Sequence, residues 1–119
     1  MHELSIAESI LDIVAGAVES RGRVTAVSVT LGPLSGVSPD ALRFCFTEVA
    51  AEKGFDSPAL VIHEPPAQMR CRDCGHLYES KDIFEGCPQC ESLNRELLSG
   101  HEFFVESVEL EEEEDGENA

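Results

Sequence analysis

The sequence is poor in aromatic and basic side chains. Its 119 residues include no tryptophan, one tyrosine and six phenylalanines. It therefore offers no extended surface for base stacking, and a core has to be built from Leu, Ile, Val, Ala and the phenylalanines. Lys and Arg number 8 against 24 Asp and Glu, which gives a formal net charge of −16. Such a chain repels a polyanion, and we expect no nucleic acid partner.

Long apolar runs are missing as well. No stretch approaches the roughly 18 apolar residues that a membrane span needs, and the first residues lack the basic and apolar segments of an export signal. We therefore expect a cytoplasmic protein without membrane contact. In that reducing compartment, the five cysteines argue against a disulfide framework.

Acidic residues are concentrated near the C-terminus. Residues 106–119 hold eight acids and no base: Glu106, Glu109, Glu111, Glu112, Glu113, Glu114, Asp115 and Glu117. We expect residues 111–119 to be a disordered, solvated tail. Metal storage is the alternative, but carboxylates suit Mg²⁺ or Ca²⁺ better than transition metals.

The first predicted element is an amphipathic helix. Apolar residues recur at steps of three and four, and they comprise Leu4, Ala7, Leu11, Val14 and Val18, with Ile10 and Ala17 widening the stripe. Ser5 and Glu8 match a capping box, and Arg21 with Gly22 supplies a stop. If Ser5 is the cap, residues 1–4 lie outside the helix with uncommitted backbone amides.

A second helix is predicted from Ser38 to Lys53. Ser38 is a favoured cap and Pro39 a favoured first residue, and one face carries Leu42, Cys45, Phe46 and Val49. We expect Cys45 to be a small buried apolar residue. Lys53 and Gly54 mark the end of this helix.

Three segments are predicted to be strands: Val24–Leu31, where apolar residues alternate, then Ala59–Glu64 and Glu102–Leu110. The fold class is therefore α+β, a small three-stranded sheet with two helices on one face and an inserted cysteine module of zinc-ribbon type. We expect one discontinuous domain at residues 1–66 and 98–110, and a metal-binding domain at 67–97.

The four cysteines of the module are spaced for one metal ion. Cys71 and Cys74 form one C-x-x-C pair, and twelve residues later Cys87 and Cys90 form another. Each pair can direct two sulfurs at the same ion, and two pairs complete a tetrahedron. We predict a structural Zn(II) site, with iron or redox-active dithiols as alternatives.

The residues that follow the two cysteine pairs differ. Gly75 follows the first pair and permits a tight turn. Glu91 follows the second, and we expect this turn to be less regular.

The N-terminal residues offer a second kind of metal site. A lone histidine near a terminus is usually not a ligand. However, the Met1 amine, the deprotonated backbone nitrogens of His2 or Glu3 and the His2 imidazole can close small chelate rings in one plane, which favours Ni(II) or Cu(II). Two amidate ligands would offset the repulsion between a cation and the positive end of the following helix.

Taken together, these motifs resemble the HypA/HybF family of hydrogenase-maturation nickel chaperones. The resemblance rests on the opening Met1-His2-Glu3-Leu4-Ser5-Ile6-Ala7, on Leu31-Gly32 and on the two C-x-x-C pairs. It implies a nickel metallochaperone rather than an enzyme. His2 would anchor Ni(II) as transient cargo, assisted by the N-terminal backbone and by Glu3, while Cys71, Cys74, Cys87 and Cys90 hold Zn(II). The implied partners are a HypB-type GTPase and the nickel-iron hydrogenase large subunit, or urease in some members.

Two other functions remain as alternatives. The cysteine module could be an interaction surface in a protein that binds no nickel. A thiol oxidoreductase or zinc hydrolase is disfavoured, because zinc with four thiolates offers no water site and no Ser-His-Asp or Glu-x-x-His set is present. Among the other histidines, His63 and His101 are expected at surface or hydrogen-bonded positions, and His76 is the best candidate for a further ligand.

Overall fold

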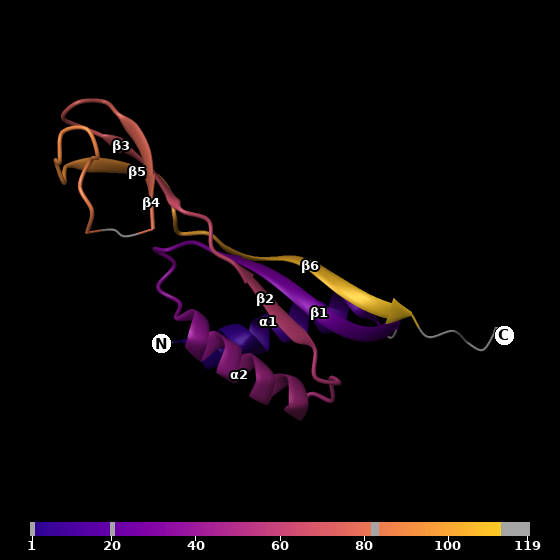
Figure 1. Cartoon of the computed structure of the whole chain (residues 1–119). Coiled ribbons are helices and arrows are strands. Elements are labelled where there is room, and N and C mark those ends of the chain that lie inside the picture. Colours follow the sequence, from indigo (N-terminus) through magenta and orange to yellow (C-terminus); the bar gives the residue numbers. More distant parts are fainter. Residues whose placement is uncertain (1, 20, 82–83, 113–119) are drawn as a thin grey trace. The chain divides into compact units, whose positions relative to one another are not determined.

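The fold consists of a helix-covered sheet and a small all-strand module. The computed structural model describes residues 2–19, 21–81 and 84–112. Within them the elements are α1 (Glu3–Val18), β1 (Gly22–Leu31), α2 (Pro39–Glu52), β2 (Ala59–His63), β3 (Ala67–Cys71), β4 (Leu77–Ser80), β5 (Arg95–Ser99) and β6 (Phe103–Glu112) (Figure 1). The strands form two three-stranded sheets, ordered β2-β1-β6 and β4-β3-β5. This confirms the predicted α+β class.

The chain divides into two units. The first comprises Met1–Val29, Val37–Ile62 and Val105–Ala119, and the second comprises Thr30–Gly36 and His63–Phe104. The expected domain boundaries, at residues 66/67 and 97/98, both lie inside the second unit, because this unit begins earlier, at His63, and ends later, at Phe104. The second unit also contains the segment after β1, Thr30–Gly36. None of the described helices is long and apolar enough to cross a membrane.

In the first unit, α1 and α2 lie on the same face of the β2-β1-β6 sheet (Figure 1). The core is aliphatic and consists of Ala7, Ile10, Leu11, Val14, Val18, Val24, Val27, Val29, Leu42, Val49 and Ala50 together with Phe46. The six phenylalanines were all candidates for the core, but only Phe46 is buried. Phe44 is 68% exposed, because two residues along a helix turn the side chain to the opposite face.

Helix α1 starts earlier than the Ser5 cap predicts. His2 is its N-cap residue, without a side-chain cap bond, and its carbonyl accepts the Ile6 N–H at 3.0 Å. The predicted capping box is therefore wrong. The cause is tertiary: the earlier start places Glu3 on the buried face, where its carboxylate accepts the Ser38 N–H at 2.8 Å.

The other helix ends follow the sequence signals more closely. Ser38 caps α2 by accepting the Ala41 N–H at 3.3 Å, with Pro39 as the first helical residue. Helix α1 ends at Val18, and its C-cap residue Glu19, with a φ of 50°, adopts the left-handed conformation that was predicted for Gly22. Arg21 donates to the Val18 carbonyl at 3.1 Å.

Cys45 of α2 was predicted to be a buried apolar residue. In the structure it is only half-buried, so this prediction is wrong.

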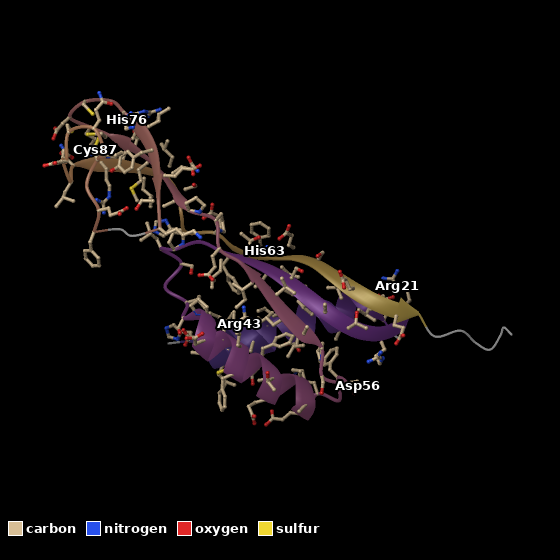
Figure 2. All side chains as sticks on the ribbon, in the orientation of Figure 1. Arg21, Arg43, Asp56, His63, His76 and Cys87 are labelled. Atoms are coloured by element: carbon tan, nitrogen blue, oxygen red, sulfur yellow. The ribbon has the colours of Figure 1, made fainter. Side chains whose placement is uncertain are left out.

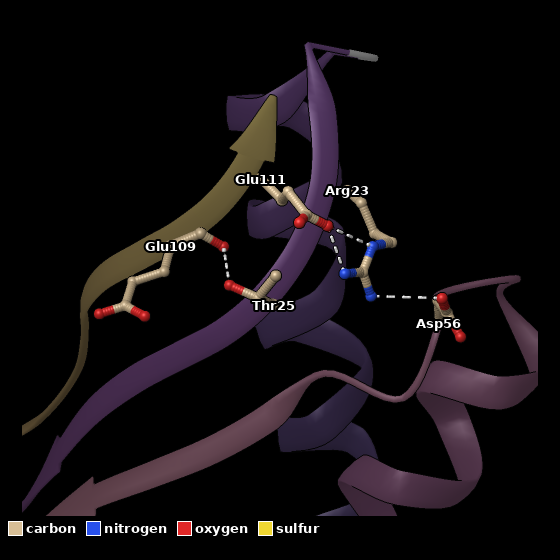
Figure 3. A network of polar contacts seen from close by, with 5 residues as sticks. All are labelled: Arg23, Thr25, Asp56, Glu109 and Glu111. Carbon is tan, nitrogen blue, oxygen red and sulfur yellow. Dashed lines mark hydrogen bonds and ion pairs between the residues drawn. The ribbon is translucent and has the colours of Figure 1, made fainter. Parts of the chain in front are cut away.

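Strand β6 continues into the segment predicted to be a tail. Glu111 pairs with Arg23 of β1, which also contacts Asp56 at 3.3 Å, and Thr25 donates to the Glu109 carbonyl at 3.2 Å (Figure 3). The side chains of both ion pairs are largely exposed, so we expect each pair to contribute little stability. The expected tail at 111–119 is thus wrong for residues 111 and 112, and residues 113–119 lie outside the described part.

The second unit is built on an antiparallel sheet. Met69 of β3 lies opposite Tyr78 of β4 and Leu97 of β5. One face of this sheet buries a very small core made of Ala67, Met69, Cys71, Tyr78 and Cys87, with Leu97 packed against it. Two of the five buried residues are cysteines of the predicted metal site, and the module has few other apolar residues with which to stay folded.

The Leu31-Gly32 pair, one of the motifs that carry the resemblance, has a structural explanation within the second unit. Gly32 donates its N–H to the Glu102 carbonyl at 2.8 Å, and Leu34 donates to the Gly100 carbonyl at 2.7 Å. A Cβ atom on Gly32 would lie 2.6 Å from the Gly100 carbonyl carbon and closer still to its oxygen. Only glycine permits this close approach of two backbone segments.

Candidate metal sites

The two C-x-x-C pairs form two equivalent turns. In the first turn, Gly75 has a φ of +80°, and its N–H donates to the Cys71 carbonyl at 2.9 Å. In the second turn, Glu91 has a φ of +64° and donates to the Cys87 carbonyl at 2.7 Å. The expectation of a less regular second turn is therefore wrong: Glu91 adopts the conformation that glycine adopts in the first.

The four sulfurs converge as a metal ion requires. Cys71 Sγ lies 3.5 Å from Cys90 Sγ, Cys74 Sγ lies 3.6 Å from Cys87 Sγ, and all four atoms are within 4.8 Å of one another. With Zn–S bonds of about 2.3 Å, the corners of a tetrahedron are about 3.8 Å apart. The cysteine set therefore fits a tetrathiolate zinc site.

Backbone amides support the sulfurs in both turns. Cys74 donates its N–H to Cys71 Sγ, and Gln89 donates to Cys87 Sγ, each at 3.4 Å. The Cys74 N–H is the main reason why the pKa of the Cys71 thiol is lowered to about 7. At Cys90, the Ser92 N–H acts in the same direction, but the surrounding thiols, Cys71 first, outweigh it and raise the pKa to about 12. A cation relieves this mutual repulsion of thiolates.

The conformation of Glu91 gives a stability prediction. Holding a non-glycine residue in the left-handed region costs about 1–2 kcal/mol. Glycine avoids this cost, but part of the gain is lost because glycine gives up more backbone entropy on folding. We expect Glu91→Gly to raise the free energy of unfolding of the zinc-loaded protein by about 0.5–1 kcal/mol, measured by chemical denaturation. Gly75→Ala, at a φ of +80° with open space around it, should lower it. Equal stability of Glu91→Gly and Glu91→Ala would contradict this explanation.

At the N-terminus, the predicted site residues differ in their surroundings. His2 is exposed, and Glu3 is only 5% exposed. Met1, whose amine was predicted to bind nickel, lies outside the described residues. Because Glu3 is the first residue of α1 and Ser38 is the N-cap of α2, the Glu3 carboxylate lies at the N-terminal ends of both helices, where negative charge is favoured.

The same surroundings determine how Glu3 titrates. The pKa of Glu3 is lowered from 4.5 to about 2. The chain's amino group is the largest cause of this shift, and the Ser38 N–H is the next. The carboxylate therefore stabilises the fold above pH 4.5, and this contribution is lost as the pH falls towards 2. Carboxyl-detected NMR titration should give a midpoint near 2 in the folded protein and near 4.5 in urea. A folded-state midpoint near 4.5 would show that the carboxylate is not held this way.

The remaining histidines do not join the cysteine cluster. His76 follows the first turn (Figure 2). Its ring stacks on Tyr78, with ring centroids 6.1 Å apart. His63 ends β2, and His101 lies between β5 and β6; both are exposed. Among the described residues, the only group of three or more potential metal ligands is the four cysteines.

One polar cluster beside the cysteines was not predicted from the sequence. Asp73, inside the first C-x-x-C pair, accepts hydrogen bonds from Ser92 and from Asn94 Nδ2, the latter at 3.3 Å. Ser92 and Asn94 follow the second pair. These residues meet because the chain passes the first turn again after the second cysteine pair. No rule of residue spacing predicts this contact.

The chain matches a family profile and several relatives over nearly its whole length. The family profile described as "Hydrogenase/urease nickel incorporation, metallochaperone, hypA" matches residues 1–110. The hydrogenase maturation factor HypA of Chlorobium luteolum is 40% identical over 115 residues, which cover 95% of this chain and 98% of that protein. HypA of Dehalococcoides mccartyi strain CBDB1 is 38% identical, with coverage of 95% and 97%.

A solved structure shares the fold. The solution structure of the Ni metallochaperone HypA from Helicobacter pylori matches with a TM-score of 0.62 and 23% sequence identity, covering 95% of this chain and 100% of that one. The profile match over almost the whole chain and the relatives near 40% identity agree with the cluster of four cysteines. The chain belongs to the HypA family of hydrogenase and urease nickel-incorporation metallochaperones.

Proposed function

We propose that this protein binds Ni(II) at its N-terminus and delivers it for the maturation of a nickel-iron hydrogenase in the cytoplasm. Zn(II) is held by Cys71, Cys74, Cys87 and Cys90 and keeps the second unit folded. Nickel is cargo in this scheme and leaves by ligand exchange, so the protein is not an enzyme. The family description supports nickel handling, and the observation that carries the N-terminal site is the exposed His2 at the very start of α1.

The start of a helix suits the proposed ligand set. The first N–H groups of a helix have no intrahelical acceptors, so deprotonating the amide of His2 breaks no bond to a helix carbonyl. The Glu3 N–H also has no such bond, although it contacts the Glu3 carboxylate. Together with the Met1 amine and the His2 imidazole, these nitrogens supply the planar donor set that Ni(II) favours. An exposed, incomplete site also allows a recipient to replace the ligands one at a time.

Glu3 acts in this proposal by position and not through its carboxylate as a ligand. The carboxylate is buried and accepts the Ser38 N–H, so its charge is used at the ends of two helices. There it offsets the positive potential that would repel a dication. The backbone nitrogen of Glu3 remains a candidate ligand.

The proposed partners are a HypB-type GTPase and the large subunit of a nickel-iron hydrogenase. The relatives are named hydrogenase maturation factors, which supports hydrogenase as the recipient. The family description also includes urease. Complementation separates the two recipients: in a strain that lacks its own factor, the gene should restore hydrogenase activity, and restoration of urease alone would identify the other recipient.

A nickel titration tests the binding site. Untagged, zinc-loaded protein should give the absorption spectrum of planar, diamagnetic Ni(II). His2→Ala should lose this spectrum and weaken nickel binding by more than the roughly 10–100-fold typical of outer-shell changes, with its zinc content unchanged. One glycine added before Met1 should have a similar effect, because it displaces the amine from the chelate ring.

The matched control is His101→Ala, which removes another exposed histidine and should bind nickel as the wild type does. Equal nickel affinity in the wild type and His2→Ala would eliminate the N-terminal site. The cysteine module would then be better interpreted as an interaction surface.

A further inference from the structure

We propose that Asp73 is a positioning residue that fastens the two cysteine turns to each other and thereby sets how long zinc remains bound. The inference rests on the zinc site of the proposed function. It concerns the cluster of Asp73, Ser92 and Asn94, which we call the knuckle latch. None of these three side chains contributes a sulfur to the site, so the latch acts through the residues that do.

The contacts of the latch run from one turn to the other without a gap. Asp73 lies between the ligands Cys71 and Cys74, and its two carboxylate oxygens accept from Ser92 Oγ and from Asn94 Nδ2. Ser92 Oγ in turn accepts the Asn94 N–H at 3.0 Å. The Ser92 carbonyl accepts the N–H of the ligand Cys87 at 2.9 Å.

A backbone bond completes the connection. Arg72, next to Asp73, donates its N–H to the Asn94 carbonyl at 2.9 Å. The two turns are thus joined by side-chain and backbone bonds that do not involve the metal. Because the sulfur pairs that face each other come from different turns, a movement of one turn relative to the other separates Cys71 from Cys90 and Cys74 from Cys87. Preventing this movement preorganises the site and slows the first step of zinc release.

The negative charge of Asp73 makes the proposal testable, because a purely electrostatic role predicts the opposite effect on the rate of zinc release. A tetrathiolate zinc site carries a net charge of −2, so a nearby carboxylate repels it. If Asp73 acted only through its charge, removing that charge would slow zinc release. If it acts as a latch, removing the acceptor oxygens speeds zinc release. The direction of the change therefore distinguishes the two roles.

Zinc release is measured on the full-length, zinc-loaded protein with an excess of a chromogenic chelator. We expect Asp73→Ala to release zinc about tenfold faster than the wild type, within the range known for outer-shell residues. Asp73→Asn keeps an oxygen that can accept from Ser92 Oγ, and should lie between the wild type and Asp73→Ala. Ser92→Ala should also speed release, and adding it to Asp73→Ala should change the rate little further.

Two controls separate the latch from folding and from charge. The cobalt-substituted variants should keep the tetrathiolate absorption spectrum of the wild type, which shows that the ligands and their geometry are retained. Glu91→Gln removes one negative charge beside the second turn without touching the latch oxygens, and should not speed release. A wild type that gives no tetrathiolate cobalt spectrum would contradict the zinc site itself. Wild-type release rates in Asp73→Ala and Ser92→Ala, or slower release in Asp73→Ala, would overturn the latch.

Discussion

Replacing Cys87 by serine is expected to abolish zinc binding and unfold the second unit. The core cluster on its β4-β3-β5 sheet consists of five buried residues, and Cys71 and Cys87 are two of them. The change therefore removes a ligand and a core side chain together. Structural zinc contributes roughly 10–16 kcal/mol in small zinc-binding peptides, far more than so small a core supplies. Two-dimensional NMR should show the resonances of residues 67–99 collapsing to unfolded positions.

The same experiment has an internal reference in the first unit. Its aliphatic core contains no metal ligand from the cysteine cluster, so the helical circular dichroism of α1 and α2 should persist. Cys45→Ser is the matched control, because it changes a half-buried thiol outside the cluster and should leave zinc content unchanged. A second unit that stays folded in Cys87→Ser, or in wild type stripped of zinc, would contradict a structural role for the metal.

Gly32→Ala is expected to be strongly destabilising although it adds only one methyl group. The new Cβ would collide with the Gly100 carbonyl, which is backbone and cannot rotate away. The segments must move apart, which strains the bonds from Gly32 to Glu102 and from Leu34 to Gly100. Overpacking and a lost backbone hydrogen bond together predict a loss of about 2–4 kcal/mol in the free energy of unfolding. Denaturant unfolding, followed by NMR signals of the second unit, measures it.

A second glycine provides the control for this substitution. Gly16 lies within α1, and a Cβ there would meet nothing within 4 Å. Gly16→Ala should therefore stabilise the protein by up to about 1 kcal/mol, because alanine has the higher helix propensity. If both alanine variants changed stability by the same amount and in the same direction, close backbone approach would not be the reason for glycine at position 32.

Local signals in the sequence predicted those features that depend on neighbouring residues. Ser38 and Pro39 start α2 as expected, and the spacing of the cysteines predicted one cluster, which the sulfur distances bear out. Both are determined within a few residues. Strands β3, β4 and β5 were not predicted, because segments of four or five residues around the cysteines carry too little alternation to be recognised.

Long-range contacts determined the features that were predicted wrongly. The capping box at Ser5 and Glu8 is a sound local signal, but the bond between Glu3 and Ser38, 35 residues apart, favours an earlier helix start. Glu111 belongs to an acidic run whose composition predicts a tail, but it lies in strand β6 and contacts Arg23, 88 residues away. Composition and periodicity cannot report such pairs, since they describe only residues adjacent in the chain.

The unequal burial of the four cysteine residues has a consequence for oxidative damage. Cys74 and Cys90 are exposed, whereas Cys71 and Cys87 are buried. A peroxide therefore meets the exposed cysteine of each turn first, and converting its thiolate to sulfenic acid removes a metal ligand. The inner sulfurs are shielded by the module's own packing. We therefore expect an oxidant to release the metal ion before the oxidant reacts with the buried cysteines. Prompt reduction of the sulfenic acid would then allow the module to bind the metal again.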